Sequence, residues 1–435
     1  MGNSTHTYIE LALAYAHAAL FDEAAGLLLQ APPTDPMIFY YLGWVQAEAG
    51  NVDAARAAFA YAKAMPPDYC FPNEVECVAA LETAIAHDPT DARAPYYLGN
   101  FWYAHRRYDE AIGAWEQARS LDPSFPTVHR NLGIAYANKR GDFVQARACY
   151  TAAFALDPTD ARVLFEYDQL AKRLGVLPAE RLAFLTQHMD LVDRRDDLTV
   201  EYITLLNLTG QHDAALSRLL ARTFHPWEGG EGKVTGQYVA ALVVLAQERL
   251  RSGDAAGAVD LLARARVYPP NLGEGKLPNA RENQIDYWLG CAYRQMGEPQ
   301  QAAAHFELAA AGSVEPAAPL YYNDQPPDMI LYQAFARREL GDRVAAQAIA
   351  QGLLDYGRTQ AAQTVSVDYF AVSLPDFLVF DDDLQRRHRL HCEYMAGLGY
   401  LGLGQGDEAA ACFDRVLAED PAHLGAALHR KLAAA

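Results

Sequence analysis

Small and apolar residues recur along this chain with the spacing of amphipathic helices that come in antiparallel pairs. The pattern is clearest in residues 96–123, where the positions that carry it are Leu98, Gly99, Trp102, Ala111, Trp115 and Ala118, closed by Asp122-Pro123. Gly and Ala at the crossing points let two helices approach closely. The spacing predicts a helix–turn–helix unit of about 34 residues, which buries its apolar face only by stacking on similar units.

The same pattern returns in most of the chain and resembles the tetratricopeptide repeat. Clear copies fall near 5–36, 36–66, 92–125, 126–160, 283–313 and 390–423, one of them with an extra residue near Arg140-Gly141. The segments between them keep the helical period and a turn glycine but lose the small residue at the first crossing point. We therefore predict an all-α fold: an α-α superhelix, or tetratricopeptide solenoid, of eight to nine helical pairs with several long inserted loops. It is expected to form one continuous domain over residues 1–435.

Composition restricts the function. Apolar residues make up 51% of the chain, and 36 basic residues face 55 acidic ones for a net charge of −19. Such a surface repels phosphate backbones, so we expect no nucleic acid partner. The longest apolar run, residues 238–246, is too short to span a bilayer, and with no signal or anchor the expected location is the cytoplasm.

The cysteines and histidines predict neither disulfides nor a metal centre. Six cysteines are scattered without a C-x-x-C pair and are expected to be buried, reduced thiols. His388, His391 and Cys392 are the one cue for zinc, and they are too few for a structural site. We expect neither a metal nor any other cofactor.

The concave face of a repeat superhelix is the first candidate site, because stacked first helices commonly hold an extended peptide there. The residues expected to face this groove are Tyr96, Asn100, Tyr103, Arg130, Asn131, Asn138 and Arg162. Chaperone adaptors of the tetratricopeptide family clamp a carboxylate with two Asn and three basic residues. Asn100, Asn131 and Arg162 resemble part of that set, whereas Tyr96 and Glu166 replace two of its basic residues. This favours a general peptide or protein groove over a chaperone-tail site.

Four long insertions between helices form the second candidate site, because loops of this length are often functional. Two of them share Gly-Glu-Gly-Lys, at 230–233 and 273–276, but both lack the flanking residues of a phosphate-binding loop. One interpretation is structural: the loops interlock through Glu231 and Lys276, or Glu274 and Lys233. The other is a polar and aromatic ligand pocket, of which the candidate residues are His225, Trp227, Glu228, Glu231, Lys233, Tyr268, Asn271, Glu274, Lys276, Asn323, Asp324, Asp328, Asp381 and Asp382.

Carboxylates in these loops raise the question of sugar hydrolysis, which uses a carboxylate pair. An acidic chain places carboxylates everywhere, however, so the pattern is not specific and we assign no catalytic residue. An enzymatic role is the less favoured interpretation.

A closer resemblance involves the loops themselves. Asp68-Tyr69-Cys70-Phe71-Pro72, the two Gly-Glu-Gly-Lys loops, residues 322–328 and residues 368–376 look like the tetratricopeptide-bearing C-terminal part of large bacterial proteins. In those proteins a mutarotase-like β-sandwich of unknown function precedes the solenoid. The resemblance implies a carbohydrate-linked setting. This chain enters its first repeat near Met1, so a separate polypeptide could supply the sandwich.

Two hypotheses follow. The leading one is a non-enzymatic scaffold that binds a protein partner, such as a separately encoded β-sandwich domain, through its groove and loops. The alternative is a carbohydrate-binding or carbohydrate-processing protein that holds a saccharide in the pocket formed by the Gly-Glu-Gly-Lys and Asp-rich loops.

Overall fold

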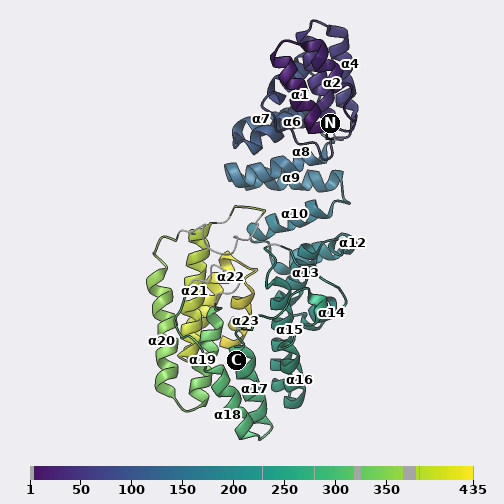
Figure 1. Cartoon of the computed structure of the whole chain (residues 1–435). Helices are drawn as coiled ribbons and strands as arrows, with labels where there is room; N and C mark the ends of the chain where they lie inside the picture. Colours follow the sequence, from purple (N-terminus) through teal and green to yellow (C-terminus); the bar gives the residue numbers. More distant parts are fainter. Residues whose placement is uncertain are drawn as a thin grey trace. The chain divides into compact units, whose positions relative to one another are not determined.

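The computed structural model describes residues 4–227, 229–278, 280–317, 325–365, 379–381 and 383–434, and all regular elements within them are helices (Figure 1). Contacts between residues group the chain into two compact units, Met1–Val163 and Leu164–Ala435. Each unit is described by itself. The prediction of an all-α, paired-helix superhelix is confirmed.

The first unit consists mainly of antiparallel helix pairs in chain order. Its elements are α1 (Thr5–His17), α2 (Phe21–Leu28), α3 (Pro36–Glu48), α4 (Val52–Ala64), α5 (Cys77–His87), α6 (Arg93–Ala104), α7 (Tyr108–Leu121), α8 (Pro126–Ala135), η1 (Tyr136–Arg140) and α9 (Phe143–Leu156). Helix α5 departs from the pairing, because it packs between α3 and α6 instead of against a partner of its own.

The second unit also consists of helices, and it contains the longest ones, α15, α20 and α21. After α10 (Ala161–Arg173), which begins at the end of the first unit, its elements are α11 (Pro178–Thr186), α12 (Met189–Val192), α13 (Asp196–Leu208), α14 (His212–Leu220), α15 (Lys233–Arg251), α16 (Ala255–Ala265), η2 (Pro270–Leu272), α17 (Asn283–Gln295), α18 (Pro299–Ala309), α19 (Pro327–Glu339), α20 (Arg343–Gln360), α21 (Leu384–Gly402), α22 (Gly406–Glu419) and α23 (Leu424–Ala433). The final helix α23 packs on α22 and α21 and also contacts α13.

In five of the six clear pairs, a glycine on the first helix faces an aromatic ring on the second helix. A Cβ atom at Gly99 would lie 2.4 Å from the Trp115 ring, so the ring fills the space that a side chain would need. The same contact joins Gly43 to Phe59, Gly133 to Tyr150, Gly290 to Phe306, and Gly397 to Phe413. The small residue at the first crossing point is therefore a packing requirement.

The α8–α9 pair has one residue more between its glycine and its ring than the α6–α7 pair. That residue is taken up at the end of the first helix, where Tyr136–Arg140 forms a single π-helical turn. Gly141, at φ 62°, then ends the turn in the left-handed conformation. A π-turn lengthens the helix locally without shifting the packing register of the next one.

Many of the helices begin at an aspartate that accepts a hydrogen bond from their first turn. Asp35 accepts from the backbone N–H of Met37 at 2.8 Å, and Asp142 accepts from that of Gln145 at 3.0 Å. Asp254 does the same for Gly257, at 2.9 Å. These caps satisfy backbone donors that have no partner within the helix, and so they fix where each helix begins.

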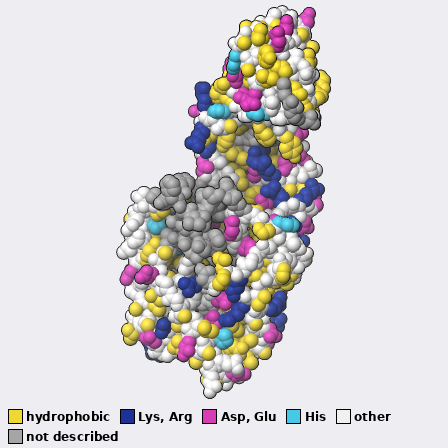
Figure 2. Space-filling view, in the orientation of Figure 1, with side chains coloured by type: hydrophobic (Ala, Val, Ile, Leu, Met, Phe, Trp, Pro, Cys, Tyr) yellow, Lys and Arg dark blue, Asp and Glu magenta, His cyan; other side chains and the backbone are white. Residues whose placement is uncertain are grey.

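The surface shows both signs of charge. In the space-filling view, acidic and basic side chains are interspersed over the visible face (Figure 2). Among the described residues, no helix is both long enough and apolar enough to cross a membrane.

Candidate functional site

The predicted groove residues of the first unit lie on consecutive first helices. Tyr96, Asn100 and Tyr103 are on α6, and Arg130 and Asn131 are on α8. Asn138 lies in the π-turn η1, and Arg162 lies on α10. Except for the buried Tyr96 and the exposed Arg162, these side chains are half-buried.

Two asparagines connect equivalent positions of neighbouring repeats. The Nδ2 of Asn131 donates to Oδ1 of Asn100 at 3.2 Å, and Trp115 Nε1 donates to the same oxygen at 3.1 Å. Arg130 Nη1 donates to Oδ1 of Asn131 at 3.2 Å. An amide, an indole and a guanidinium thus form one continuous polar strip across α6, α7 and α8.

The tyrosines of α6 belong to aromatic packing. The Tyr96 ring lies 4.7 Å from that of Phe125 and 5.2 Å from that of Tyr97, measured between ring centroids. Burial raises the pKa of the Tyr96 hydroxyl. Tyr103 packs on Trp115 at 5.3 Å. The rings of Tyr96 and Tyr103 therefore pack beside the polar strip, and Tyr103 contacts its member Trp115.

In the second unit, the structure brings the two Gly-Glu-Gly-Lys loops into contact. The backbone N–H of Phe224 donates to the carbonyl of Asn271 at 2.7 Å. The Asn271 Nδ2 donates to the carbonyls of Arg222 and Leu219, at 2.7 and 2.9 Å. A Cβ atom at Gly273 would lie 2.5 Å from the Phe224 carbonyl oxygen, so glycine is needed for this approach.

The charged residues of these loops are bonded differently from the pairs that their sequence suggests. Glu274 accepts from the backbone N–H of Gly232 at 3.0 Å and from the hydroxyl of Thr235 at 3.0 Å. Lys276 donates to the carbonyl of Arg266 at 3.0 Å and also pairs with Glu282. Glu231 is exposed, and Lys233 is the first residue of α15. Within the described residues, the contacts between the loops join the side chains of Asn271 and Glu274 to backbone groups and to the Thr235 hydroxyl.

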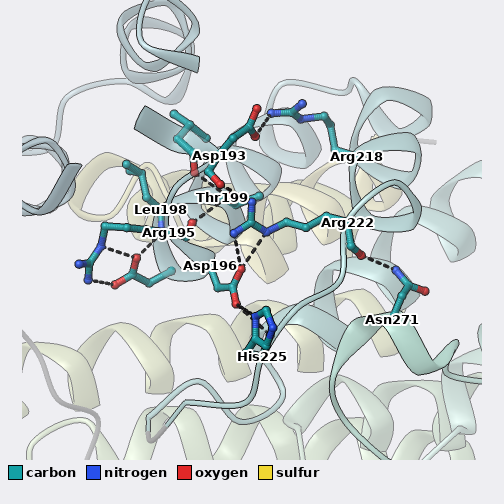
Figure 3. Close-up of polar contacts among 11 residues, drawn as sticks. Asp193, Arg195, Asp196, Leu198, Thr199, Arg218, Arg222, His225 and Asn271 are labelled. Carbon is teal, nitrogen blue, oxygen red and sulfur yellow. Dashed lines mark hydrogen bonds and ion pairs between the residues drawn. The ribbon is translucent and has the colours of Figure 1, made fainter. Parts of the chain in front are cut away.

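Asp196, at the start of α13, holds the first of these loops (Figure 3). Its Oδ1 accepts from Nε of Arg222 at 2.8 Å, and its Oδ2 accepts from the backbone N–H of His225 at 2.8 Å. The His225 ring lies 3.2 Å from the same oxygen. Burial alone would raise the pKa of Asp196, but these donors lower it.

Trp227, in the first of these loops, packs on the backbone of its own turn. A Cβ atom at Gly230 would lie 2.2 Å from the Trp227 ring, which places that ring directly over the turn. Tyr268 is half-buried, and burial raises its pKa.

Two further candidates, Asp328 and Asp381, lie in other segments of the second unit. Asp328 is in the first turn of α19, where burial raises its pKa against the opposing effect of His429 on α23. Asp381 precedes α21. Glu228, Asn323, Asp324 and Asp382 lie outside the described residues.

A buried ion cluster in the second unit had not been expected from the sequence. Arg181 donates to Asp168 at 2.6 and 3.0 Å and to Glu201 at 2.6 Å, and its side chain is 1% exposed. Lys172 completes the cluster by donating to Glu201 at 3.1 Å. These charges come from three helices, α10, α11 and α13, so only the fold brings them together.

The second unit also has a cavity of about 300 Å³, lined by residues of α17, α19, α21 and α23 and by the start of α22. Its lining includes Tyr287, Trp288, Phe335 and Arg338, and the Arg338 guanidinium lies 5.1 Å from the centre of the Phe335 ring. None of the predicted loop residues that the structure describes lines this cavity.

Candidate metal ligands have partners within the protein. His388 Nε2 lies 2.8 Å from the Gln360 carbonyl, and His391 Nε2 lies 3.2 Å from that of Ala317. Across the described residues, the one set close enough to share an ion is His6, Glu10 and Glu74, and there both ring nitrogens face carboxylates. All six cysteines are unpaired thiols.

Comparison with known families agrees with this architecture. Residues 103–139 match the model of the TPR repeat, and residues 287–311 match the model of the tetratricopeptide repeat. The chain therefore contains tetratricopeptide repeats, one match in each unit.

Individual proteins with tetratricopeptide repeats are similar to parts of this chain. Tetratricopeptide repeat protein 37 of Xenopus laevis is 30% identical over 152 residues, which cover 33% of this chain and 10% of that protein. Among solved structures, YrrB, "a TPR protein with an unusual peptide-binding site", is 16% identical with a TM-score of 0.30, covering 53% of this chain and 90% of YrrB. A tetratricopeptide repeat protein from Parabacteroides merdae is 12% identical with a TM-score of 0.30, covering 69% and 98% of the two chains.

Proposed function

We propose that this protein is a non-enzymatic scaffold that binds a partner protein along the first-helix face of its first unit. The observation that carries the proposal is the hydrogen bond between Asn100 and Asn131, which joins half-buried amides of consecutive repeats into one strip. Repeat proteins generally bind their partners along such a face.

The strip has the chemistry to bind a peptide backbone. An amide has two N–H donors and an acceptor oxygen, and Asn131 uses one N–H for Asn100 within the described part of the chain. Its second N–H can serve a partner carbonyl. Because Trp115 and Arg130 already hold the two amides in place, binding requires little further ordering of these side chains.

The partner that the loop resemblance suggests is a separately encoded β-sandwich domain, in a bacterial cytoplasm. In the large bacterial proteins that the loops resemble, a β-sandwich and a solenoid belong to one chain. Binding of a separate β-sandwich would bring the same two domains together. No catalytic residue is needed for this role.

The test is affinity capture of the full chain from extracts of its native cell, quantified by mass spectrometry. Asn131→Ala and Arg130→Ala should each reduce recovery of a stoichiometric partner by roughly tenfold. Arg147→Ala is the matched control, because Arg147 is exposed on the second helix α9. A partner retained by both groove variants, or none recovered at all, would refute the proposal.

Saccharide binding by the loops is the second candidate, and it depends on Trp227 and the exposed Glu231. The contacts of Asn271, Glu274 and Lys276 within the protein argue against it, because these polar groups are already bonded. A saccharide array with the wild type and Trp227→Ala decides the matter: specific binding that this substitution abolishes would establish the alternative.

A further inference from the structure

The connection between α4 and α5 in the first unit is the clearest feature that the groove does not explain. It spans residues 65–76, here called the 65–76 loop, whereas α7 ends at Leu121 and α8 already begins at Pro126. The loop contains the Asp68-Tyr69-Cys70-Phe71-Pro72 motif. This connection is longer than most connections between helices, and long loops are often functional.

Residues of the loop alternate between the core and the solvent. Cys70 is 3% exposed and Pro72 is buried, while Tyr69 is 94%, Phe71 76% and Val75 68% exposed. Three large apolar side chains therefore point outward from one short segment. Single exposed apolar residues are common. Several large ones in one short segment are typical of an interaction surface.

The loop is anchored, so these side chains are presented by a fixed backbone. The Cys70 thiol donates to Asp35 at 3.4 Å, the same carboxylate that caps α3. Burial raises the pKa of this thiol well above its ordinary range. At the other end of the loop, Glu74 and Glu76 pair with His6 and His17 of α1, at 3.6 and 3.1 Å.

The backbone at Tyr69 is itself unusual. Its φ of +57° lies in the left-handed region, which a residue with a side chain seldom adopts. Strained backbone of this kind is concentrated at binding sites.

Charge indicates the kind of partner. Within the 65–76 loop the ionisable groups besides Tyr69 and Cys70 are Asp68, Glu74 and Glu76, and the loop contains no Lys or Arg. A segment with exposed aromatic side chains and only acidic charges is complementary to apolar residues flanked by basic ones.

We propose that the 65–76 loop is a docking surface for a cationic, amphipathic segment of a partner protein. The partner's apolar side chains pack on Tyr69 and Phe71, and its basic side chains lie against Asp68 and Glu74. This surface is separate from the Asn100–Asn131 strip, and the proposal does not depend on that strip binding anything.

The experiment is selection of displayed random peptides on the immobilised full chain, followed by affinity measurements on the selected peptides. The expected result is enrichment of peptides with net positive charge and several large apolar residues. Tyr69→Ser/Phe71→Ser should weaken their binding at least about tenfold, and Asp68→Lys should weaken it most at low salt. Val144→Ser is the matched control, because Val144 is 79% exposed on α9 and should not affect binding.

Several outcomes would overturn the proposal. They are selection of no peptides, selection of neutral or acidic peptides, and undiminished binding by the double variant. Dimers of the wild type that dissociate in the double variant would instead identify a second copy of the chain as the occupant. Binding to anionic phospholipid vesicles that the double variant loses would identify a lipid surface. Circular dichroism melting checks that the double variant keeps its fold, as expected for exposed side chains.

Discussion

Glu274 accepts a hydrogen bond from the backbone N–H of Gly232 at 3.0 Å, so one inserted loop caps the helix that follows the other. Helix α15 begins at Lys233, directly after Gly232, and a carboxylate at this end satisfies donors that have no partner within the helix. Glu274 follows α16 and Gly232 precedes α15, so this contact joins the two ends of one helix pair of the second unit.

Replacing Glu274 tests this cap. Glu274→Ala should lower the free energy of unfolding by about 1 kcal/mol, the usual value of a lost helix cap. Glu231→Ala is the neighbouring control, because Glu231 is exposed and should have little effect. Urea denaturation of both variants provides the measurement. Equal stability of Glu274→Ala and the wild type would show that the contact contributes nothing.

The same residue predicts a pH dependence. Burial raises the pKa of Glu274, although the bonds from Thr235 and Gly232 oppose the shift. The part of the stability that depends on protonation of Glu274 is therefore fully present below the unfolded pKa of about 4.3 and is lost as pH rises through the folded pKa. Glu274→Gln, which stays neutral, should gain stability relative to the wild type as pH increases through this range. A difference that does not change with pH would contradict the raised pKa.

The buried ion cluster should be sensitive to the loss of its centre. Arg181→Met leaves Asp168 and Glu201 without their shared cation, and should lower the free energy of unfolding by about 3–5 kcal/mol. Lys172→Met removes a cation that is 35% exposed and should cost much less. Thermal and urea unfolding of the two variants can be compared directly, and similar losses in both would show that Arg181 is not the dominant partner.

Acid should weaken the same cluster. Burial alone would raise the pKa of Glu201, but Lys172 and Arg181 lower it to about 2. A depressed pKa contributes stability that is present above the unfolded value and is lost as pH falls through the folded one. Glu201→Gln should therefore reduce the loss of stability between about pH 4.3 and pH 2, measured by unfolding at each pH.

A pair of glycines tests the packing of the repeat. Gly99→Ala places a methyl group against the Trp115 ring and should destabilise the first unit by about 1–3 kcal/mol. Gly113→Ala, on the partner helix α7, meets open space and should stabilise it by about 0.5–1 kcal/mol. Melting temperatures that move in opposite directions would support this account. A similar shift in both would mean that the ring moves aside.

Hydrogen exchange can measure how strongly Asp196 anchors residues 222–227. Asp196→Ala removes the acceptor for the His225 backbone N–H and for Arg222, so exchange in residues 222–227 should accelerate. Asp190→Ala is the control, because Asp190 is exposed and pairs with Arg194 only at 3.9 Å. If both variants exchange like the wild type, other contacts hold the loop.

The sequence by itself determined the helices and their pairing. Gly99 and Trp115 fall at spacings that only a helical pair brings together, and this relation is local and repeats along the chain. A residue pattern with a helical period sets its own secondary structure, and close neighbours in sequence then pack together. For this reason the all-α superhelix could be predicted without tertiary information.

Only the tertiary structure decided which polar groups meet. Glu274 and Gly232 lie far apart in the sequence, and the spacing suggested Glu–Lys pairs where a carboxylate instead caps a helix. Arg181, Asp168 and Glu201 come from three helices whose orientation no spacing reveals. In the 65–76 loop, the inward turn of Cys70 and the outward turn of Tyr69 follow from backbone angles and from the distant carboxylate of Asp35. Polar contacts of this kind depend on distances of a few ångströms across elements, and a one-dimensional pattern does not contain them.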